Sequence, residues 1–183
     1  MPYVEGSLLV VMEATSTNGS KLAVLCVDEQ GSSHNGTASQ VKVLRQAREL
    51  KIPIWLIEFN PALGTPKYAE CIHHVTNTQI AQAAGEGARR LRKPYLNAFM
   101  GTTLQDELKE AGVETIVLMG QHTNSCVRST AIGGTDEPRM KDVQTSGAVH
   151  RGFTVCTALD IVVHEVPNEA FAQNRKVWVF RYL

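Results

Sequence analysis

Continuous apolar runs that end at polar residues constrain the fold of this chain more than any other feature. Residues 22–27 (LAVLCV) are apolar throughout and stop at Asp28, and residues 54–59 (IWLIEF) and 114–119 (ETIVLM) are nearly as apolar. A strand with one exposed face alternates apolar and polar residues, whereas a parallel strand covered on both faces is apolar almost throughout. The three runs therefore predict buried parallel strands.

Segments with helical spacing lie between these runs. Residues 41–50 carry apolar side chains every three or four positions, residues 78–91 are rich in alanine, and residues 103–111 end at Gly112. A further strand is predicted at 153–158, and residues 161–163 either extend it or begin another. Strands that alternate with helices through short turns predict an α/β fold, a doubly wound three-layer α/β/α sandwich with a mostly parallel sheet.

The two ends of the chain do not fit this alternation. Residues 1–20 form an N-terminal extension, in which 7–12 (SLLVVM) predict either an added edge strand or a hairpin. The C-terminal residues 176–183 (KVWVFRYL) predict a strand, which pairs either with the N-terminal segment or with another subunit. The 183 residues are otherwise expected to form one domain, 1–183.

Charge and composition exclude several classes of protein. The 18 basic and 18 acidic residues give no net charge. The chain therefore lacks the excess of basic residues expected of a protein that binds nucleic acid mainly through the phosphates. No apolar run approaches the roughly 18 residues that span a bilayer, and the N-terminus lacks a signal-peptide pattern. We expect a cytoplasmic protein that binds neither nucleic acid nor membrane and keeps its cysteines reduced, because they are widely spaced. These are Cys26, Cys71, Cys126 and Cys156.

Cys126 is the first candidate for chemistry. It follows the predicted strand 114–119 and lies near the start of a predicted helix, with Thr123-Asn124 at the capping position. Unpaired backbone N–H groups and the helix dipole favour a thiolate there, and the thiolate is the nucleophile. The alternative is that Cys126 packs as a small apolar residue.

Two charged residues complete the set of candidates. In a doubly wound sheet the ligand crevice lies beyond the C-terminal ends of the strands, which is where Asp28 is expected. Asp28 either faces this crevice or only ends the strand in a turn. Lys93 directly precedes Pro94, and taken alone it is best explained as an exposed lysine.

Together, these positions resemble the isochorismatase-like cysteine hydrolases. The matching blocks are residues 27–30 (VDEQ), Lys93 with Ala98-Phe99 and Thr102 or Thr103, and residues 120–128 (GQHTNSCVR). Residues 152–155 (GFTV) and Asp160 are similar to the family's following strand and closing aspartate. The resemblance covers roughly residues 21 to 160, and it is specific for the family but not for a substrate.

The resemblance implies a catalytic triad and a reaction. Asp28 would be the general acid and base, Cys126 the nucleophile and Lys93 the cation between them. The reaction would cleave a small amide or related C–N bond through a thioester, which water activated by Asp28 would hydrolyse. Backbone N–H groups of His122 and Cys126 would hold the oxyanion, beside a cis peptide bond between Gln121 and His122.

Departures from the family pattern refine this expectation. Members that resemble nicotinamidases carry a metal-binding Asp-x-His pair after the second strand, where this chain has residues 58–61 (EFNP). We therefore expect no catalytic metal and no other cofactor, and we interpret His73-His74 as exposed. Isochorismate-cleaving members lack the nucleophilic cysteine, so Cys126 favours amide or carbamoyl chemistry. The candidate pocket residues are Gln30, Glu58, Asn60 and Asn97.

Other expectations concern the surroundings of the site. In the family a single helix follows the cysteine, whereas residues 133–147 here form an inserted loop that is either a lid or a surface insertion. The resemblance also implies a homo-oligomer, a dimer or tetramer, acting on a small-molecule substrate. Two other functions stay open, a non-catalytic small-molecule-binding or scaffold protein of the same fold and a redox-sensing thiol protein.

Overall fold

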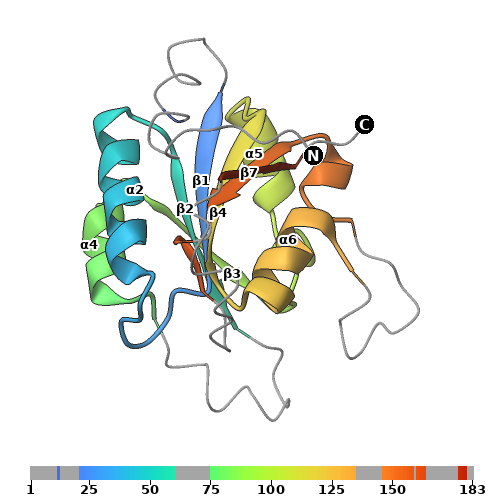
Figure 1. Cartoon of the computed structure of the whole chain (residues 1–183). Helices are drawn as coiled ribbons and strands as arrows, with labels where there is room; N and C mark the ends of the chain where they lie inside the picture. Colours follow the sequence, from blue (N-terminus) through green and yellow to red (C-terminus); the bar gives the residue numbers. More distant parts are fainter. Residues whose placement is uncertain are drawn as a thin grey trace.

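The fold is a single mixed sheet with helices on both faces (Figure 1). The computed structural model describes residue 12 and residues 21–60, 75–134, 146–158, 160–163 and 177–180. Within these residues seven strands form a sheet of order β3-β2-β1-β4-β5-β7, with β6 beside β4. The strands are β1 (Leu22–Val27), β2 (Ile54–Phe59), β3 (Arg89–Lys93), β4 (Thr115–Gln121), β5 (Thr154–Ala158), β6 (Val162–Val163) and β7 (Val177–Phe180).

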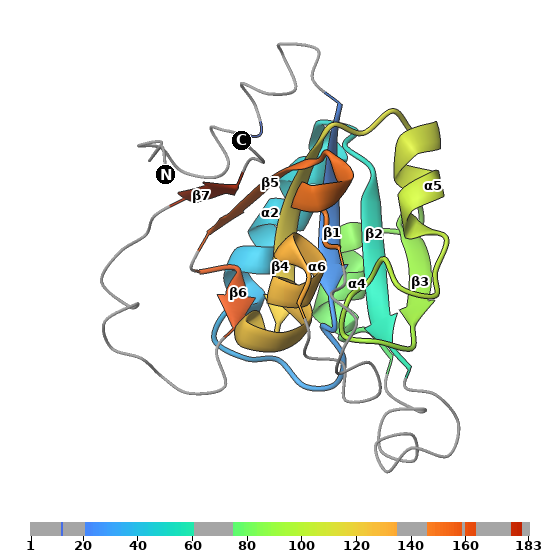
Figure 2. The same cartoon turned by 90° about the vertical axis from the view of Figure 1, so that its right-hand side faces the viewer.

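The helices form the outer two layers. α2 (Thr37–Glu49) and α4 (Thr78–Ala84) cover one face of the sheet, while α5 (Leu104–Glu110) and α6 (Arg128–Ile132) cover the other (Figures 1 and 2). A π-helical turn, η1 (Thr123–Val127), leads into α6, and a short 3-10 helix, η2 (Val149–Arg151), precedes β5. The strand pairs are parallel except for β5 with β7. The predicted doubly wound three-layer sandwich is confirmed.

Strand β1 shows why the apolar runs are continuous. All six of its residues are buried, and alternate side chains enter two separate cores. Leu22, Val24 and Cys26 pack with α2 and α4, whereas Ala23, Leu25 and Val27 pack on the opposite face. A strand buried on both faces has no position for a polar side chain until it ends at Asp28.

The alanine-rich segment 78–91 is where the helix prediction is wrong. α4 ends at Ala84, because Gly85 adopts φ 78° and its N–H closes the last turn on Ala81 O at 3.0 Å. Residues 89–93 then form the edge strand β3, paired with β2. An edge strand exposes part of its surface, so its arginine-rich sequence lacks the apolar run that marks β1 and β2.

The strand predicted at the C-terminus is confirmed for residues 177–180, and its pairing with the N-terminal segment or with another subunit stays a prediction. β7 pairs antiparallel with β5 of the same chain, with Val155 opposite Phe180. Residues 162–163 form the separate strand β6, which pairs with the end of β4. The predicted segment 7–12 lies outside the described residues apart from Met12, which is buried in the core beside α2.

The two ends of the inserted loop 133–147 lie against each other. α6 ends at Gly133, which has φ 76°, and a Cβ on Gly147 would overlap the backbone nitrogen of Gly133. The N–H of Ala148 then donates to Thr130 O at 2.8 Å. The chain therefore returns to the helix it left, while residues 135–145 lie outside the described part. Among the described residues, no helix is long and apolar enough to cross a bilayer.

Candidate active site

The three sequence blocks meet at the C-terminal ends of the central strands. Lys93 is the last residue of β3, Asp28 follows β1, and Cys126 lies in η1 after β4. The Lys93 Nζ lies 3.0 Å from Asp28 Oδ2, and both groups interact with the Cys126 thiol. Lys93 is fully buried, and Asp28 and Cys126 are 6% and 4% exposed. The structure thus brings the predicted acid, cation and nucleophile together in a site shielded from water.

The backbone around Asp28 is tightly determined. Asp28 adopts the left-handed conformation, φ 57°, and its N–H donates to Ile57 O at 2.8 Å. Few residues other than glycine adopt this conformation, which costs of order 1–3 kcal/mol. Gly120 of β4 pairs with Val27, and a Cβ there would overlap the Val27 carbonyl oxygen. Glycine at position 120 therefore allows β4 to approach the residue directly before Asp28.

Lys93 is held by backbone carbonyls as well as by its carboxylate partner. Its Nζ donates to Tyr95 O at 3.1 Å and Leu96 O at 3.2 Å, and lies 4.7 Å from the centre of the Phe59 ring. Burial lowers the pKa of the Lys93 ammonium, but the nearby Asp28 carboxylate and Cys126 outweigh it, so the pKa lies above its ordinary value. Lys93 is thus a charged group fixed inside the protein, not the exposed lysine that its local sequence suggests.

The turn that carries Cys126 differs from the prediction in two ways. The predicted cap, Thr123-Asn124, is wrong, since these residues lie inside η1 and His122 is the capping residue without a side-chain cap. The predicted cis peptide bond between Gln121 and His122 is also wrong, because the described residues contain no cis bond and His122 makes the turn with φ 62°. The His122 carbonyl then accepts hydrogen bonds from Ser125 N and Val127 N, which begins the wide π turn.

The acidity of Cys126 is opposite to the sequence expectation. Burial, followed by the Asp28 carboxylate, raises the pKa of the thiol to about 12, and Lys93 offsets only part of this rise. The expected position of Cys126 at a helix N-terminus favoured a thiolate. That expectation took no account of the burial of the thiol away from water or of the negative charge of Asp28 beside it. At neutral pH the resting Cys126 is therefore a thiol, and its proton must leave during the reaction.

Two of the four predicted pocket residues are bound into the framework. Glu58 shares a strand face with Ile54 and Leu56, which pack with α2 and α4, so it points away from Cys126. Its carboxylate accepts from Thr76 Oγ1 at 2.7 Å and Arg90 Nη1 at 3.0 Å. These contacts give Glu58 a framework role, and a contact of Glu58 with substrate stays an untested prediction.

Asn97 is fully buried in the loop that follows Lys93. Its Nδ2 donates to Ser146 O at 3.1 Å and its Oδ1 accepts from Phe99 N at 3.0 Å. Asn97 therefore joins this loop to the end of the inserted segment, and its predicted contact with substrate stays a prediction.

The other two pocket candidates lie close to the triad. The side chain of Gln30 brackets the backbone of Phe59, accepting from its N–H at 2.7 Å and donating to its carbonyl at 3.2 Å. The N–H of Asn60 donates to Lys93 O at 2.9 Å. Gln30 and Asn60 thus hold the end of β2 beside Lys93, and contact with a substrate stays a prediction for both.

Sequence reasoning missed Glu29, a second buried carboxylate next to Asp28. It is 2% exposed and accepts hydrogen bonds from His34, Gln40 and Gln121. The available signal was the pair of acidic residues at the end of a buried strand, because a buried carboxylate needs donors. Nothing in the sequence indicates which donors fold onto it.

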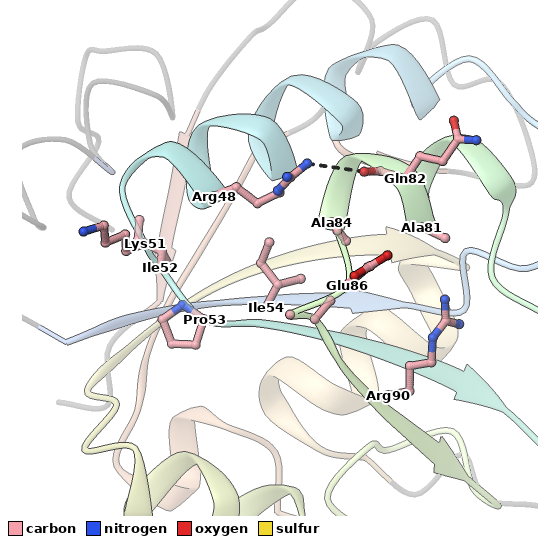
Figure 3. Close-up of a pocket in the computed structure, with 13 residues that line it drawn as sticks. Arg48, Lys51, Ile52, Pro53, Ile54, Ala81, Gln82, Ala84, Glu86 and Arg90 are labelled. Atoms are coloured by element: carbon pink, nitrogen blue, oxygen red, sulfur yellow. Dashed lines mark hydrogen bonds between the residues drawn. The ribbon is translucent and has the colours of Figure 1, made fainter.

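The described residues offer no candidate metal centre. No group of three His, Cys, Asp or Glu side chains in these residues is arranged to hold a metal ion, and His73-His74 lie outside them. A surface groove between α2, α4 and the start of β2 lies at the opposite ends of the strands from the triad (Figure 3). Arg48 in this groove donates to Gln82 O at 3.4 Å and so covers the end of α4.

Comparison with known proteins identifies the family. The sequence model described as the Isochorismatase domain matches residues 27–137, which is more than half of the chain. The chain belongs to the isochorismatase family. A maleamate amidohydrolase from Pseudomonas putida is 38% identical over 69 residues, which are 38% of this chain and 29% of that protein. The match therefore spans less than a third of the length of this curated relative.

Solved structures of an amidase and a nicotinamidase share the fold. The N-carbamoylsarcosine amidase of Thermoplasma acidophilum superposes with a TM-score of 0.59 at 20% identity, over 81% of this chain and 87% of that one. A nicotinamidase of Bacillus subtilis gives a TM-score of 0.62 at 15% identity, over 80% and 88% of the two chains. At such low identities these similarities establish the fold alone.

Proposed function

We propose that this protein is a cysteine-dependent hydrolase that cleaves a small amide or related C–N bond through a thioester intermediate. The observation that carries the proposal is the buried ion pair of Lys93 with Asp28, 3.0 Å apart, both partners of which shift the pKa of the Cys126 thiol. Family membership supports it, since proteins similar to this chain are named an amidase, a nicotinamidase and an amidohydrolase.

The first half-reaction forms the thioester. Asp28 accepts the thiol proton as Cys126 Sγ attacks the carbonyl carbon, because a thiol with a pKa of about 12 does not ionise beforehand at neutral pH. The carbonyl π electrons move to oxygen, where the N–H groups of His122 and Cys126 stabilise the oxyanion. When the oxyanion collapses, the C–N bond breaks and Asp28 returns its proton to the nitrogen. Ammonia or an amine leaves, and Cys126 carries the acyl group.

The second half-reaction restores the enzyme. Asp28 accepts a proton from water as the water oxygen attacks the thioester carbon, and the C–S bond then breaks. The sulfur leaves as Cys126 regains the proton from Asp28. Lys93 keeps its charge throughout, because its ion pair and two carbonyl contacts hold the ammonium in place. It orients the Asp28 carboxylate and offsets the negative charge that passes between Asp28 and the substrate.

The test is ammonia release from a panel of small primary amides and carbamoyl compounds. Wild-type protein should release ammonia from at least one of them, and Cys126→Ala and Lys93→Ala should abolish release. Cys156→Ala is the matched control, since Cys156 is also outside any disulfide and is also 4% exposed, but lies in β5. Release that survives Cys126→Ala would refute the proposal.

Two other results would replace this function with those left open by the sequence. A protein that releases no ammonia, and whose Cys126 reacts no faster than a buried thiol at any pH, would be a binding or scaffold member of the fold. A reversible sulfenate or disulfide at Cys126 under mild peroxide would indicate a redox-sensing thiol.

We also propose that the protein works in the reducing cytoplasm as a homo-oligomer, a dimer or tetramer. The described cysteines Cys26, Cys126 and Cys156 form no disulfide, which fits a reducing compartment. Zero net charge does not oppose self-association. Light scattering after size-exclusion chromatography tests the oligomeric state, and a monomer at working concentration would refute that part.

A further inference from the structure

A second buried carboxylate lies directly beside the proposed general base. Glu29 is 2% exposed, and its two oxygens accept three hydrogen bonds from side chains. His34 Nε2 lies 2.5 Å from Oε2, Gln40 Nε2 donates to Oε1 at 2.6 Å, and Gln121 Nε2 donates to Oε2 at 3.2 Å. The reaction proposed above does not use this group.

The donors come from three separate parts of the fold. His34 lies in the loop before α2, Gln40 lies within α2, and Gln121 is the last residue of β4. Gln40 Nε2 also donates to Ile161 O at 2.9 Å, and the same carbonyl accepts from Gly120 N at 3.1 Å. The Glu29 carboxylate thereby links the end of β1 to α2, to the end of β4 and to the segment that leads into β6.

The side chains around position 29 present only N–H donors, which match a carboxylate. His34 Nδ1 accepts from Gly36 N at 3.1 Å, so the neutral ring donates to Glu29 through Nε2. The side chains of Gln40 and Gln121 also present N–H groups. Three N–H donors therefore converge on the two carboxylate oxygens of Glu29. An amide at position 29 has only one oxygen, so its own N–H groups would face at least one of these donors. Such an unmatched buried contact is unfavourable.

The bond between Glu29 and Gln121 spans the two turns that carry the proposed chemistry. Glu29 follows Asp28, and Gln121 precedes His122, whose N–H is a proposed oxyanion donor. Asp28 and His122 are both left-handed, with φ 57° and 62°, so neighbouring contacts must hold each in place. We propose that Glu29 is a positioning residue, which fixes the Asp28 carboxylate relative to the turn of His122 and Cys126. This inference rests on the proposed function.

Kinetics of the intact protein test the proposal. Glu29→Gln should lower kcat about 10- to 100-fold, because a small displacement of a catalytic group costs rate. KM should stay within about twofold of the wild-type value, since Glu29 does not touch the substrate. Gln121→Leu should lower kcat in the same way, and the double variant should be no slower than the slower single one.

A control separates positioning from general loss of stability. Glu107 on α5 accepts from Trp55 Nε1 at 2.8 Å and from Thr103 Oγ1, and it lies away from the triad. Glu107→Gln should lower the melting temperature yet leave kcat unchanged. The proposal would be overturned if Glu29→Gln kept the kcat of the wild type. It would also be overturned if the losses of kcat in Glu29→Gln and Gln121→Leu simply added in the double variant.

Alkylation of Cys126 gives a readout that does not depend on turnover. The Asp28 carboxylate raises the pKa of the Cys126 thiol, so displacing it in Glu29→Gln should increase the thiolate fraction and speed reaction with iodoacetamide at pH 7.5 by about tenfold. Mass spectrometry of the peptide that contains Cys126 separates this site from the other cysteines. If wild-type protein hydrolyses no amide, the proposed function fails, and the alkylation rates still decide the role of Glu29. Faster labelling supports it, and an equal or slower rate refutes it.

Discussion

Replacing the buried Lys93 by methionine tests how the site is held together. Methionine keeps an unbranched side chain of similar length but removes the ammonium. The variant loses the 3.0 Å ion pair with Asp28 and the hydrogen bonds to Tyr95 O and Leu96 O. The loss leaves a buried carboxylate and two carbonyl groups without their partner, while the packing of the side-chain stem is largely retained.

The size of the effect follows from these contacts. Removing one partner of a buried ion pair costs about 3–5 kcal/mol. Each carbonyl group left without its donor costs about 1–3 kcal/mol, and this cost is contained in the same loss of about 3–5 kcal/mol and is not added to it. We expect Lys93→Met to lower the free energy of unfolding by about 3–5 kcal/mol, a large part of the 5–15 kcal/mol typical of a domain. Adding Asp28→Asn should recover part of this loss, because the carboxylate no longer needs a cation.

Urea denaturation measures both quantities. The midpoint should fall without a change in the slope of unfolding free energy against urea, since the surface exposed on unfolding is the same. Lys109→Met on the exposed surface of α5 is the control, with an expected change within about 0.5 kcal/mol. The account of the site would be refuted if Lys93→Met changed the free energy of unfolding by less than about 1 kcal/mol. It would also be refuted if the losses caused by Lys93→Met and Asp28→Asn simply added in the double variant.

Three further predictions follow from the same geometry. Because the pKa of Cys126 is raised to about 12, its alkylation rate should rise about tenfold per pH unit from pH 7 to 10, and a plateau below pH 9 would contradict the burial argument. Gly120→Ala should cost about 2 kcal/mol or more in a thermal melt and also slow ammonia release, because a Cβ there overlaps Val27 O beside Asp28; a fully stable and active variant would contradict this. Dialysis against EDTA should leave ammonia release unchanged, and loss of activity that zinc restores would show that the proposed metal-free reaction is wrong.

The central strands were predictable from the sequence because burial on both faces leaves a direct signature. In β1 and β2 the apolar runs coincide with the strands observed. β3 was not predictable in this way, since an edge strand with exposed arginines carries no such run. Its prediction required the stop at Gly85, whose φ of 78° ends the preceding helix.

The site was predictable in its members and less so in its properties. Family blocks and the rule for strand ends selected Asp28, Lys93 and Cys126, which the fold brings together. The acidity of Cys126 was not predictable, because it depends on burial and on charges that lie far away in the sequence. The direction of Glu58 was available from its alternation with Leu56. The donors that surround Glu29 were not predictable, because they meet only in the folded structure and Gln121 lies 92 residues away in the sequence.

The most direct test of the central claim is to identify the covalent state of Cys126 during turnover. Protein mixed with a substrate from the amide panel is quenched in acid, and its peptides are weighed by mass spectrometry. The account predicts that the peptide containing Cys126 gains the mass of the acyl group, and that hydroxylamine, which cleaves thioesters, removes this mass. Steady release of ammonia with no adduct at Cys126, and with undiminished release by Cys126→Ala, would contradict it.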